Sequence, residues 1–142
     1  MKFSEEELIT RYLFELNKQY MSKFEQCTGI SRTRLEILRT LSKGDNFSQR
    51  ELQNKVNIDP AAITRHLKQL EEQGMIVRRK NPDDNRFSLV HLTEKGKRGI
   101  GTFCEEKERV TADILNGFSD QEKKLLLCML KRLLENVNQI NG

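Results

Sequence analysis

Apolar residues recur at helical spacing along much of the chain. From Leu8 to Phe24 they return every four residues, after the capping sequence Ser4-Glu5-Glu6-Glu7, and Thr28-Gly29 follows as a stop signal. The same pattern, introduced each time by a serine or threonine that can cap a helix, recurs after Ser31, Ser48, Thr93 and Ser119. The sequence therefore predicts a mainly helical protein.

A further helix is predicted to begin at Asp59-Pro60, where an N-cap residue precedes a proline at the first helical position. Ile63, Leu67 and Leu70 form its one apolar face. Gly74 lies where a helix-ending glycine is expected. The opposite face carries small and polar residues, so it is expected to meet solvent or a partner.

Two short strands are predicted after this helix, over Met75–Lys80 and Phe87–Leu92. The tight polar turn Asn81–Arg86 separates them, with Asp84-Asn85-Arg86 at its tip. Two short helices followed by a strand, a turn and a second strand make a winged helix-turn-helix. The predicted fold class is therefore mainly α with a small antiparallel β-wing.

Long helices flank the winged unit on both sides. We expect a single domain over 1–142, in which the winged helix-turn-helix unit at 31–96 is flanked by dimerisation helices at 1–30 and 97–142. Leu8–Phe24 and Leu125–Val137 carry more apolar surface than one small winged unit needs, which favours a homodimer. The alternative is that both helices pack on the core of their own chain.

Positive charge is concentrated in the predicted winged unit. The chain carries a net charge of +4, and Ser31–Gly96 holds 13 Lys and Arg against 9 Asp and Glu, whereas the remainder holds 12 of each. A basic surface suits the phosphates of a nucleic acid. The acidic N-terminus lacks the features of a signal peptide, and no apolar run is long enough to span a bilayer, so we expect a cytoplasmic protein without membrane contact.

The outer face of the helix from Pro60 is predicted to read duplex DNA. Arg65 can form two hydrogen bonds to guanine, Gln69 can do the same to adenine, and small residues at the helix start allow close approach. Ser48 and Gln49, at the start of the preceding helix, are expected to bind phosphate. The residues on or beside the reading face are Ala61, Ala62, Thr64, Arg65, His66, Lys68 and Gln69. The alternative is an ordinary solvated helix surface.

The predicted wing supplies a second set of DNA contacts. Arg86 can enter the minor groove, where negative potential is concentrated, and Asp84 can hold its guanidinium by paired hydrogen bonds. Asn85 at the tip and Arg79 on the preceding basic strand complete the set. The alternative is a solvated hairpin tip whose ion pair contributes little.

Motifs in this region resemble those of a known family. Leu70-Glu71-Glu72-Gln73-Gly74, followed by Asp84-Asn85-Arg86 and Leu92-Thr93-Glu94-Lys95-Gly96, is similar to the pattern of the MarR family of bacterial regulators. The resemblance covers nearly the whole chain, because the flanking long helices also fit in number and order. It implies a homodimer that binds palindromic promoter sites, commonly as a repressor released by a small molecule or an oxidant. It also implies that Arg86 and Asp84 belong to the DNA-binding wing and Pro60–Gln69 to the recognition helix.

Three modes of control stay open at this point. One is a small apolar or aromatic ligand held between the dimer helices and the winged unit, although each candidate contact is better explained as a plain core residue. These candidates are Tyr12, Phe14, Tyr20, Phe24 and His91. A second is oxidation of Cys27, the one cysteine expected to be exposed, since Cys104 and Cys128 fall on or beside apolar faces. Redox-sensing members of the family carry their reactive cysteine early in the first helix, where Glu5–Tyr20 has none. The third is control by protein abundance alone.

Other functions are disfavoured by the sequence. His66 and His91 are the only histidines, no nucleophile with a base or phosphate-binding glycine loop is evident, and the three cysteines are too widely spaced for a zinc site. We therefore expect neither an enzyme nor a bound cofactor or metal. The main alternative is a winged helix used only for protein–protein binding, for which Arg86→Ala would leave partner binding intact.

Three glycines, Gly96, Gly99 and Gly101, lie near the start of the helix that follows Thr93. Each is expected to weaken a helix by about 1 kcal/mol, so close packing or flexibility must explain them. If a dimer forms, Thr93–Gly101 is where a signal from it is expected to tilt the winged unit.

Overall fold

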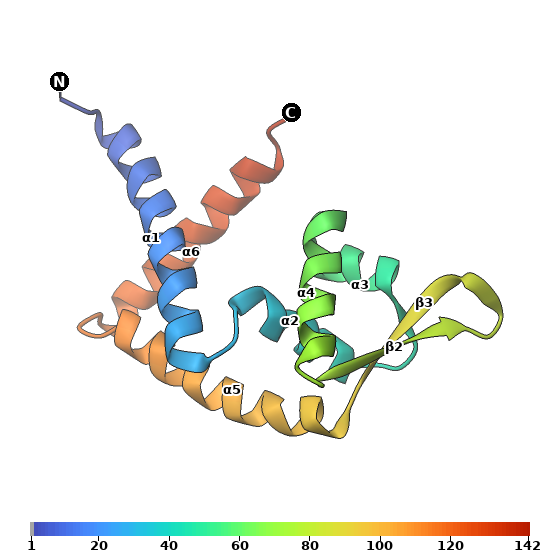
Figure 1. The fold of residues 1–142 in the computed structure, drawn as a ribbon. Helices are drawn as coiled ribbons and strands as arrows, with labels where there is room; N and C mark the ends of the chain where they lie inside the picture. Colours follow the sequence, from blue (N-terminus) through green and yellow to red (C-terminus); the bar gives the residue numbers. More distant parts are fainter. Residues whose placement is uncertain (1) are drawn as a thin grey trace. The chain divides into compact units, whose positions relative to one another are not determined.

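The computed structural model describes residues 2–142, which form six helices and three strands (Figure 1). In chain order these are α1 (Glu5–Thr28), α2 (Arg32–Ser42), β1 (Phe47–Ser48), α3 (Gln49–Val56), α4 (Pro60–Glu72), β2 (Ile76–Asn81), β3 (Asp84–Leu92), α5 (Glu94–Ile114) and α6 (Asp120–Asn138). The predicted fold class, mainly α with a small antiparallel sheet, is confirmed. The chain forms two compact units, and the boundary between Lys107 and Glu108 falls within α5.

The helices begin where the sequence predicts, because their capping side chains find the expected partners. An oxygen of the N-cap side chain accepts a hydrogen bond from the backbone N–H three residues on at Ser4, Ser31, Ser48, Asp59 and Ser119. At Ser119 the capping is reciprocal, since the Glu122 carboxylate accepts from the Ser119 backbone N–H at 2.9 Å. These local bonds set the start of each helix in the winged unit.

The end of α4 is closed by a compact backbone motif. The N–H of Gly74 donates to the carbonyl of Glu71, and the N–H of Met75 donates to the carbonyl of Leu70, both at 3.0 Å. Gly74 has a φ of +75°, which an L side chain would strain. The predicted helix-ending role of Gly74 is therefore confirmed, and the bonds are those of a Schellman motif.

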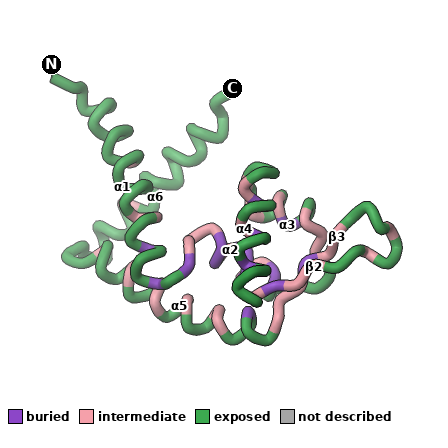
Figure 2. Tube along the Cα trace, in the orientation of Figure 1, coloured by how far each residue is buried: buried purple, intermediate pink, exposed green. Residues whose placement is uncertain are grey.

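The core lies among α2, α3, α4 and the sheet, as the buried segments in Figure 2 show. The predicted apolar face of α4 is fully buried, and so is Leu52 of α3. Val56, one helical turn after Leu52, is only half-buried. The fully buried side chains are Phe24, Ile30, Leu35, Ile37, Leu38, Leu52, Ile63, Leu67, Leu70, Ile76 and Val90.

The sheet has the order β1-β3-β2 and is antiparallel throughout. Sequence reasoning missed β1, a two-residue strand in which Phe47 pairs with Val90 and Ser48 pairs with Leu89. The turn of the wing is also shorter than predicted, because Asn81 pairs with Asp84 and only Pro82-Asp83 lies between them. The prediction that Asp84-Asn85-Arg86 forms the tip is therefore wrong, since these residues begin β3.

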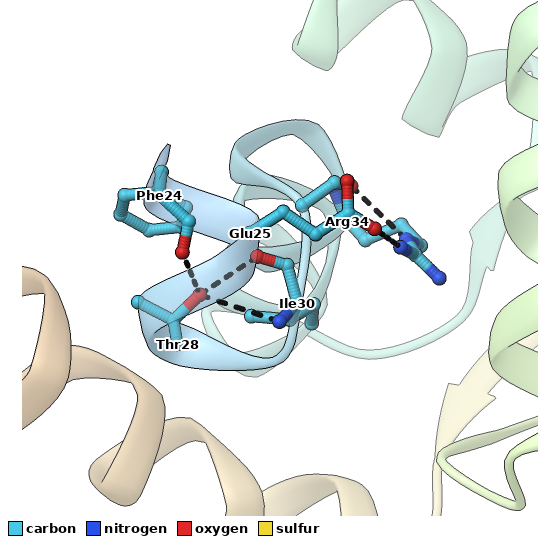
Figure 3. Close-up of polar contacts among 6 residues, drawn as sticks. Phe24, Glu25, Thr28, Ile30 and Arg34 are labelled. Carbon is cyan, nitrogen blue, oxygen red and sulfur yellow. Dashed lines mark hydrogen bonds and ion pairs between the residues drawn. The ribbon is translucent and has the colours of Figure 1, made fainter. Parts of the chain in front are cut away.

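The join between α1 and α2 is held by two sets of polar contacts, drawn in Figure 3. The Thr28 hydroxyl lies 2.7 Å from the Phe24 carbonyl and 2.8 Å from the Ile30 carbonyl, so it can donate to one of them at a time. Arg34, whose side chain is 11% exposed, donates from Nη2 to Glu25 Oε1 at 2.6 Å. The C-terminal turn of α1 is thus tied to the first turn of α2.

Many apolar side chains on α6 are exposed. None of its residues is buried, and Leu125, Leu134 and Val137 are 60% exposed or more. Along residues 2–142, none of the helices combines the length and the apolar character that a bilayer crossing requires.

Candidate nucleic-acid interface

The exposed face of α4 carries most of the residues that were predicted to read DNA. Ala61, Thr64, Arg65, Lys68 and Gln69 are exposed, whereas Ala62 is half-buried. The apolar residues on the opposite side of the helix are fully buried, so α4 cannot rotate without exposing the core. The helical pattern therefore placed this face correctly.

Thr64 and Gln49 were predicted as separate DNA contacts, but their side chains bond to each other. The Thr64 hydroxyl donates to the Pro60 carbonyl at 2.9 Å and accepts from Gln49 Nε2 at 3.1 Å. Its single hydroxyl proton is thereby used inside the protein, which leaves its methyl group for an outside partner. This bond joins the first turn of α3 to the first half of α4.

His66 is half-buried, and its Nδ1 has no hydrogen-bond partner within the described part of the chain. Burial lowers the pKa of His66 below its ordinary value, and the positive charges of Arg65 and Arg34 lower it further, while Glu25 opposes them. The imidazole therefore interacts with the α1–α2 join as well as with its own helix. Sequence reasoning, which placed His66 on the flank of the reading face, had no signal for this electrostatic interaction.

The stability of the chain is expected to fall as the pH drops below the ordinary histidine value of 6.5. The pKa of His66 is lower in the folded chain than in the unfolded chain, so the unfolded chain binds this proton more tightly. The stability that depends on a neutral His66 is therefore lost as the pH falls through the pKa of His66 in the folded chain. The urea midpoint of His66→Gln should therefore change less than that of the parent between about pH 7.5 and about pH 5.5. His91→Gln, at the other histidine, is the control. An identical pH response of His66→Gln and the parent would refute this assignment.

The wing holds Arg86 as predicted. Its Nε and Nη2 donate to the two carboxylate oxygens of Asp84 at 3.0 and 2.9 Å, and its backbone N–H donates to the same carboxylate at 3.1 Å. These bonds lower the pKa of Asp84, which keeps the carboxylate charged. The Arg86 side chain is 84% exposed, so the guanidinium is oriented by Asp84 and open to solvent on its other side.

A hollow of about 550 Å³, here called the wing-side hollow, lies between α3, the start of α4 and β3. It brings together Ser48, Gln49 and Arg86 from the predicted set, with Ser48 already bonded as the cap of α3. Sequence reasoning missed the other residues of its lining, although the spacing of one helical turn between Gln49 and Gln53 could have indicated part of it. The added residues are Arg50, Gln53, Asn54, Pro60, Phe87 and Ser88.

Arg79 and His91 lie in a different place from the wing-side hollow. They line a second hollow of about 740 Å³, together with residues of β2, β3 and the segment before α3. Phe87 lines both hollows and remains 42% exposed, with the Arg86 guanidinium 6.0 Å from its ring centroid. Arg79 is thus apart from Arg86, and Asn85 is exposed between the turn and Arg86.

The residues considered for an effector differ widely in exposure. Tyr12 is 73% exposed and Tyr20 is half-buried, whereas Phe24 is fully buried and belongs to the core. Cys27 is exposed as predicted, but the expectation that Cys128 is shielded is wrong, because Cys128 is exposed as well. Nowhere within residues 2–142 do three or more His, Cys, Asp or Glu side chains gather closely enough to hold a metal ion.

Comparison with known proteins agrees with this architecture. The MarR family model matches residues 30–87. A Bacillus subtilis HTH-type transcriptional regulator, YdgJ, is 50% identical over 139 residues, which cover 98% of this chain and 85% of that protein. A protein from Pseudomonas aeruginosa described as a probable transcriptional regulator has a similar crystal structure, with a TM-score of 0.81, 26% identity and coverage of 92% of this chain and 99% of that one. A mutant of MarR from Escherichia coli, solved in complex with operator DNA, has a TM-score of 0.77 at 22% identity, over 89% of this chain and 93% of that one.

Fold and similarity together define the class of protein. The chain is a transcriptional regulator of the winged helix-turn-helix class and not an enzyme. It belongs to the MarR family.

Proposed function

We propose that the chain binds duplex DNA sequence-specifically, as a homodimeric repressor of a palindromic promoter site. The observation that carries the proposal is the position of Arg86, which Asp84 orients at the rim of the wing-side hollow beside the first turn of α3. A guanidinium held in this way can bind a groove or a phosphate without first losing rotamer freedom.

The exposed face of α4 provides the base contacts in this proposal. Arg65 would contact guanine and Gln69 adenine, while Lys68 would bind phosphate. The free methyl group of Thr64, with Ala61 and Ala62, would pack against thymine methyl groups. Gln49 retains one amide N–H beyond its bond to Thr64 and would donate it to phosphate.

The wing completes the DNA interface in this proposal. Arg86 would enter the minor groove, with Asn85 beside it at the groove edge. Arg79, which lines the other hollow, would bind phosphate on the outer side of the wing. Ser48 would contribute through the N-terminal end of α3, because its hydroxyl already caps that helix.

Exposed apolar surface supports the homodimer. Leu8 and Leu16 on α1 are 40% and 61% exposed, and α6 exposes Leu125 and Leu134 at 61% each. Surfaces of this kind are covered in a stable protein, and a second copy of the same chain is the simplest cover. We propose that residues 1–30 and 97–142 form this dimer region. Two α4 helices would then meet half-sites about 34–36 Å apart.

Control by a small apolar or aromatic effector also belongs to the proposal, with Tyr12 and Tyr20 as its candidate contacts. Phe24 is left out because it is fully buried. Oxidation of Cys27 is the alternative, favoured by the exposure of this thiol at the last turn of α1.

Footprinting on the DNA upstream of the chain's own coding sequence tests the proposal. Purified protein at physiological salt, with random competitor DNA present, should protect a two-fold symmetric segment with half-sites about one helical turn apart. Sedimentation of the same sample should give the mass of a dimer. Equal binding to the upstream segment and to random DNA would sink the regulator proposal. For the redox alternative, peroxide should reduce the protection for the parent but not for Cys27→Ser, and unchanged protection of the parent would end it.

A further inference from the structure

The start of α5 is bonded to the end of α4, although Thr93 lies 19 positions after Gly74 in the chain. The Thr93 hydroxyl donates to the Gly74 carbonyl at 2.6 Å, and the Thr93 N–H donates to the Met75 carbonyl at 3.0 Å. The Lys95 ammonium donates to the Gln73 carbonyl at 2.8 Å. Three successive carbonyls that directly follow α4, those of Gln73, Gly74 and Met75, therefore receive donors from two residues at the start of α5.

Gly96 allows this close approach. It is the one buried residue among those of α5, and a Cβ built on it would overlap the carbonyl oxygen of Met75. Its N–H donates to the Thr93 hydroxyl at 3.0 Å, so the same hydroxyl caps α5 and bonds to α4. At Gly101, by contrast, an added Cβ would meet nothing within 4 Å. Close packing thus explains Gly96, whereas Gly101 has no such constraint.

Electrostatics favours the same arrangement. The last carbonyls of a helix lack partners within the helix and carry partial negative charge. The ammonium of Lys95 lies on that end of α4, and no Lys, Arg or His of α4 itself lies in its last turn. The positive group that complements the end of α4 is therefore supplied by α5.

We propose that Thr93, Lys95 and Gly96 are positioning residues for the recognition helix, which fix the angle at which α4 meets DNA. This inference rests on the proposed function of α4 as the base reader. It also refines the expectation that a signal from a dimer tilts the winged unit at Thr93–Gly101. The segment Thr93–Gly96 moves with α4 as one body, so a displacement of the start of α5 is passed directly to the reading face.

The test compares Lys95→Met with Lys97→Met in the full chain. Both variants remove one exposed positive charge and keep an unbranched side chain, but Lys97 bonds to Glu94 of its own helix at 3.4 Å. Lys95→Met should lower the preference for the footprinted segment over random DNA roughly tenfold, the effect of one lost charge-assisted bond. Lys97→Met should leave the preference unchanged. The salt dependence of binding should be equal in the two variants, because neither lysine is placed at a phosphate.

Hydrogen exchange provides a readout that does not depend on DNA. The amides of Gly74 and Met75, which close α4, should exchange faster in Lys95→Met than in Lys97→Met. Lys95→Arg, which keeps a donor, should restore both protection and DNA preference. Equal exchange in Lys95→Met and Lys97→Met would overturn the positioning role. Faster exchange in Lys95→Met than in Lys97→Met, together with a parent chain that shows no DNA preference, would instead uphold the contact and refute the proposed function.

Gly96→Ala and Gly101→Ala provide a second pair for the same test. Gly96→Ala should lose DNA preference and protection at Met75, because the added methyl displaces the Met75 carbonyl. Gly101→Ala should retain both. If Gly96→Ala fails to fold, Thr93→Val and its conservative counterpart Thr93→Ser make the comparison, with loss expected for valine and retention for serine. Equal behaviour of valine and serine at this position would contradict the proposal.

Discussion

Replacement of Arg86 by alanine is expected to weaken binding to the footprinted DNA segment by about 1–3 kcal/mol for each wing, and a dimer carries two wings. The slope of log affinity against log salt should also fall by about 1 for each lost cationic contact. The reason is that the Arg86 side chain is 84% exposed yet fixed by its bonds to Asp84. Electrophoretic mobility shifts over a range of salt concentrations measure both quantities.

Variants of Asp84 separate the charge of Arg86 from the orientation of its guanidinium. In Arg86→Ala the Asp84 carboxylate loses the guanidinium, keeps the bond from the backbone N–H of residue 86, and faces the DNA phosphates as a negative charge without a cation beside it. The double variant Asp84→Ala/Arg86→Ala should therefore bind more tightly than Arg86→Ala alone. Asp84→Ala by itself should lose less than Arg86→Ala, since the guanidinium stays but is no longer oriented.

Lys123→Ala is the matched control for Arg86→Ala. It removes the same charge from the first turn of α6, from a residue that lines neither hollow, and should change the affinity very little. Equal losses for Lys123→Ala and Arg86→Ala would mean that only the net charge matters, which would contradict a specific role for the wing. If the winged unit served only protein–protein binding, the parent chain would show no DNA binding, and neither substitution would change that result.

Local sequence signals predicted most of the fold because the structure uses them locally. The bond from Asp59 to Ala62 spans only three residues, so the start of α4 is readable without its surroundings. The two-residue strand β1 has no such signal, since it exists only through pairing with β3 more than 40 residues later. The wing turn was misplaced for a related reason, because an irregularity between Lys80 and Asn81 lets pairing continue to Asp84.

The residues of the candidate site could be predicted only where the regular spacing of a helix or strand places them on one face. The exposed face of α4 followed from the spacing of its apolar residues, and the Asp84–Arg86 pair followed from their separation by one residue. The bond between Gln49 and Thr64 and the interaction of His66 with Arg34 join residues 15 and 32 positions apart, which no periodic pattern marks. The same holds for Thr93 and Gly74, where a sequence motif was visible but its contact was not.

Phe24→Ala is expected to lower the free energy of unfolding by about 3–5 kcal/mol, a large part of the stability of a small domain. Phe24 is fully buried, its ring centroid lies 5.9 Å from that of Tyr20, and the Arg32 guanidinium lies 5.8 Å from its ring. Removing the ring leaves a cavity at the point where α1 joins α2, a join that the bonds of Arg34 to Glu25 only partly secure. Urea denaturation at one fixed protein concentration measures the loss, since assembly would also shift the midpoint.

Phe87→Ala provides the comparison, because it deletes the same side chain from a position that is 42% exposed. Its loss should be about 1 kcal/mol, in line with the smaller area that it removes from water. The losses of unfolding free energy in Phe24→Ala and Phe87→Ala together decide the role of Phe24, which the sequence made a candidate ligand contact. A loss below about 1 kcal/mol for Phe24→Ala would contradict a core role and return Phe24 to the effector candidates. A large loss would identify the C-terminal turn of α1 as part of the winged unit's own core, so that α1 joins that unit to the proposed dimer surface.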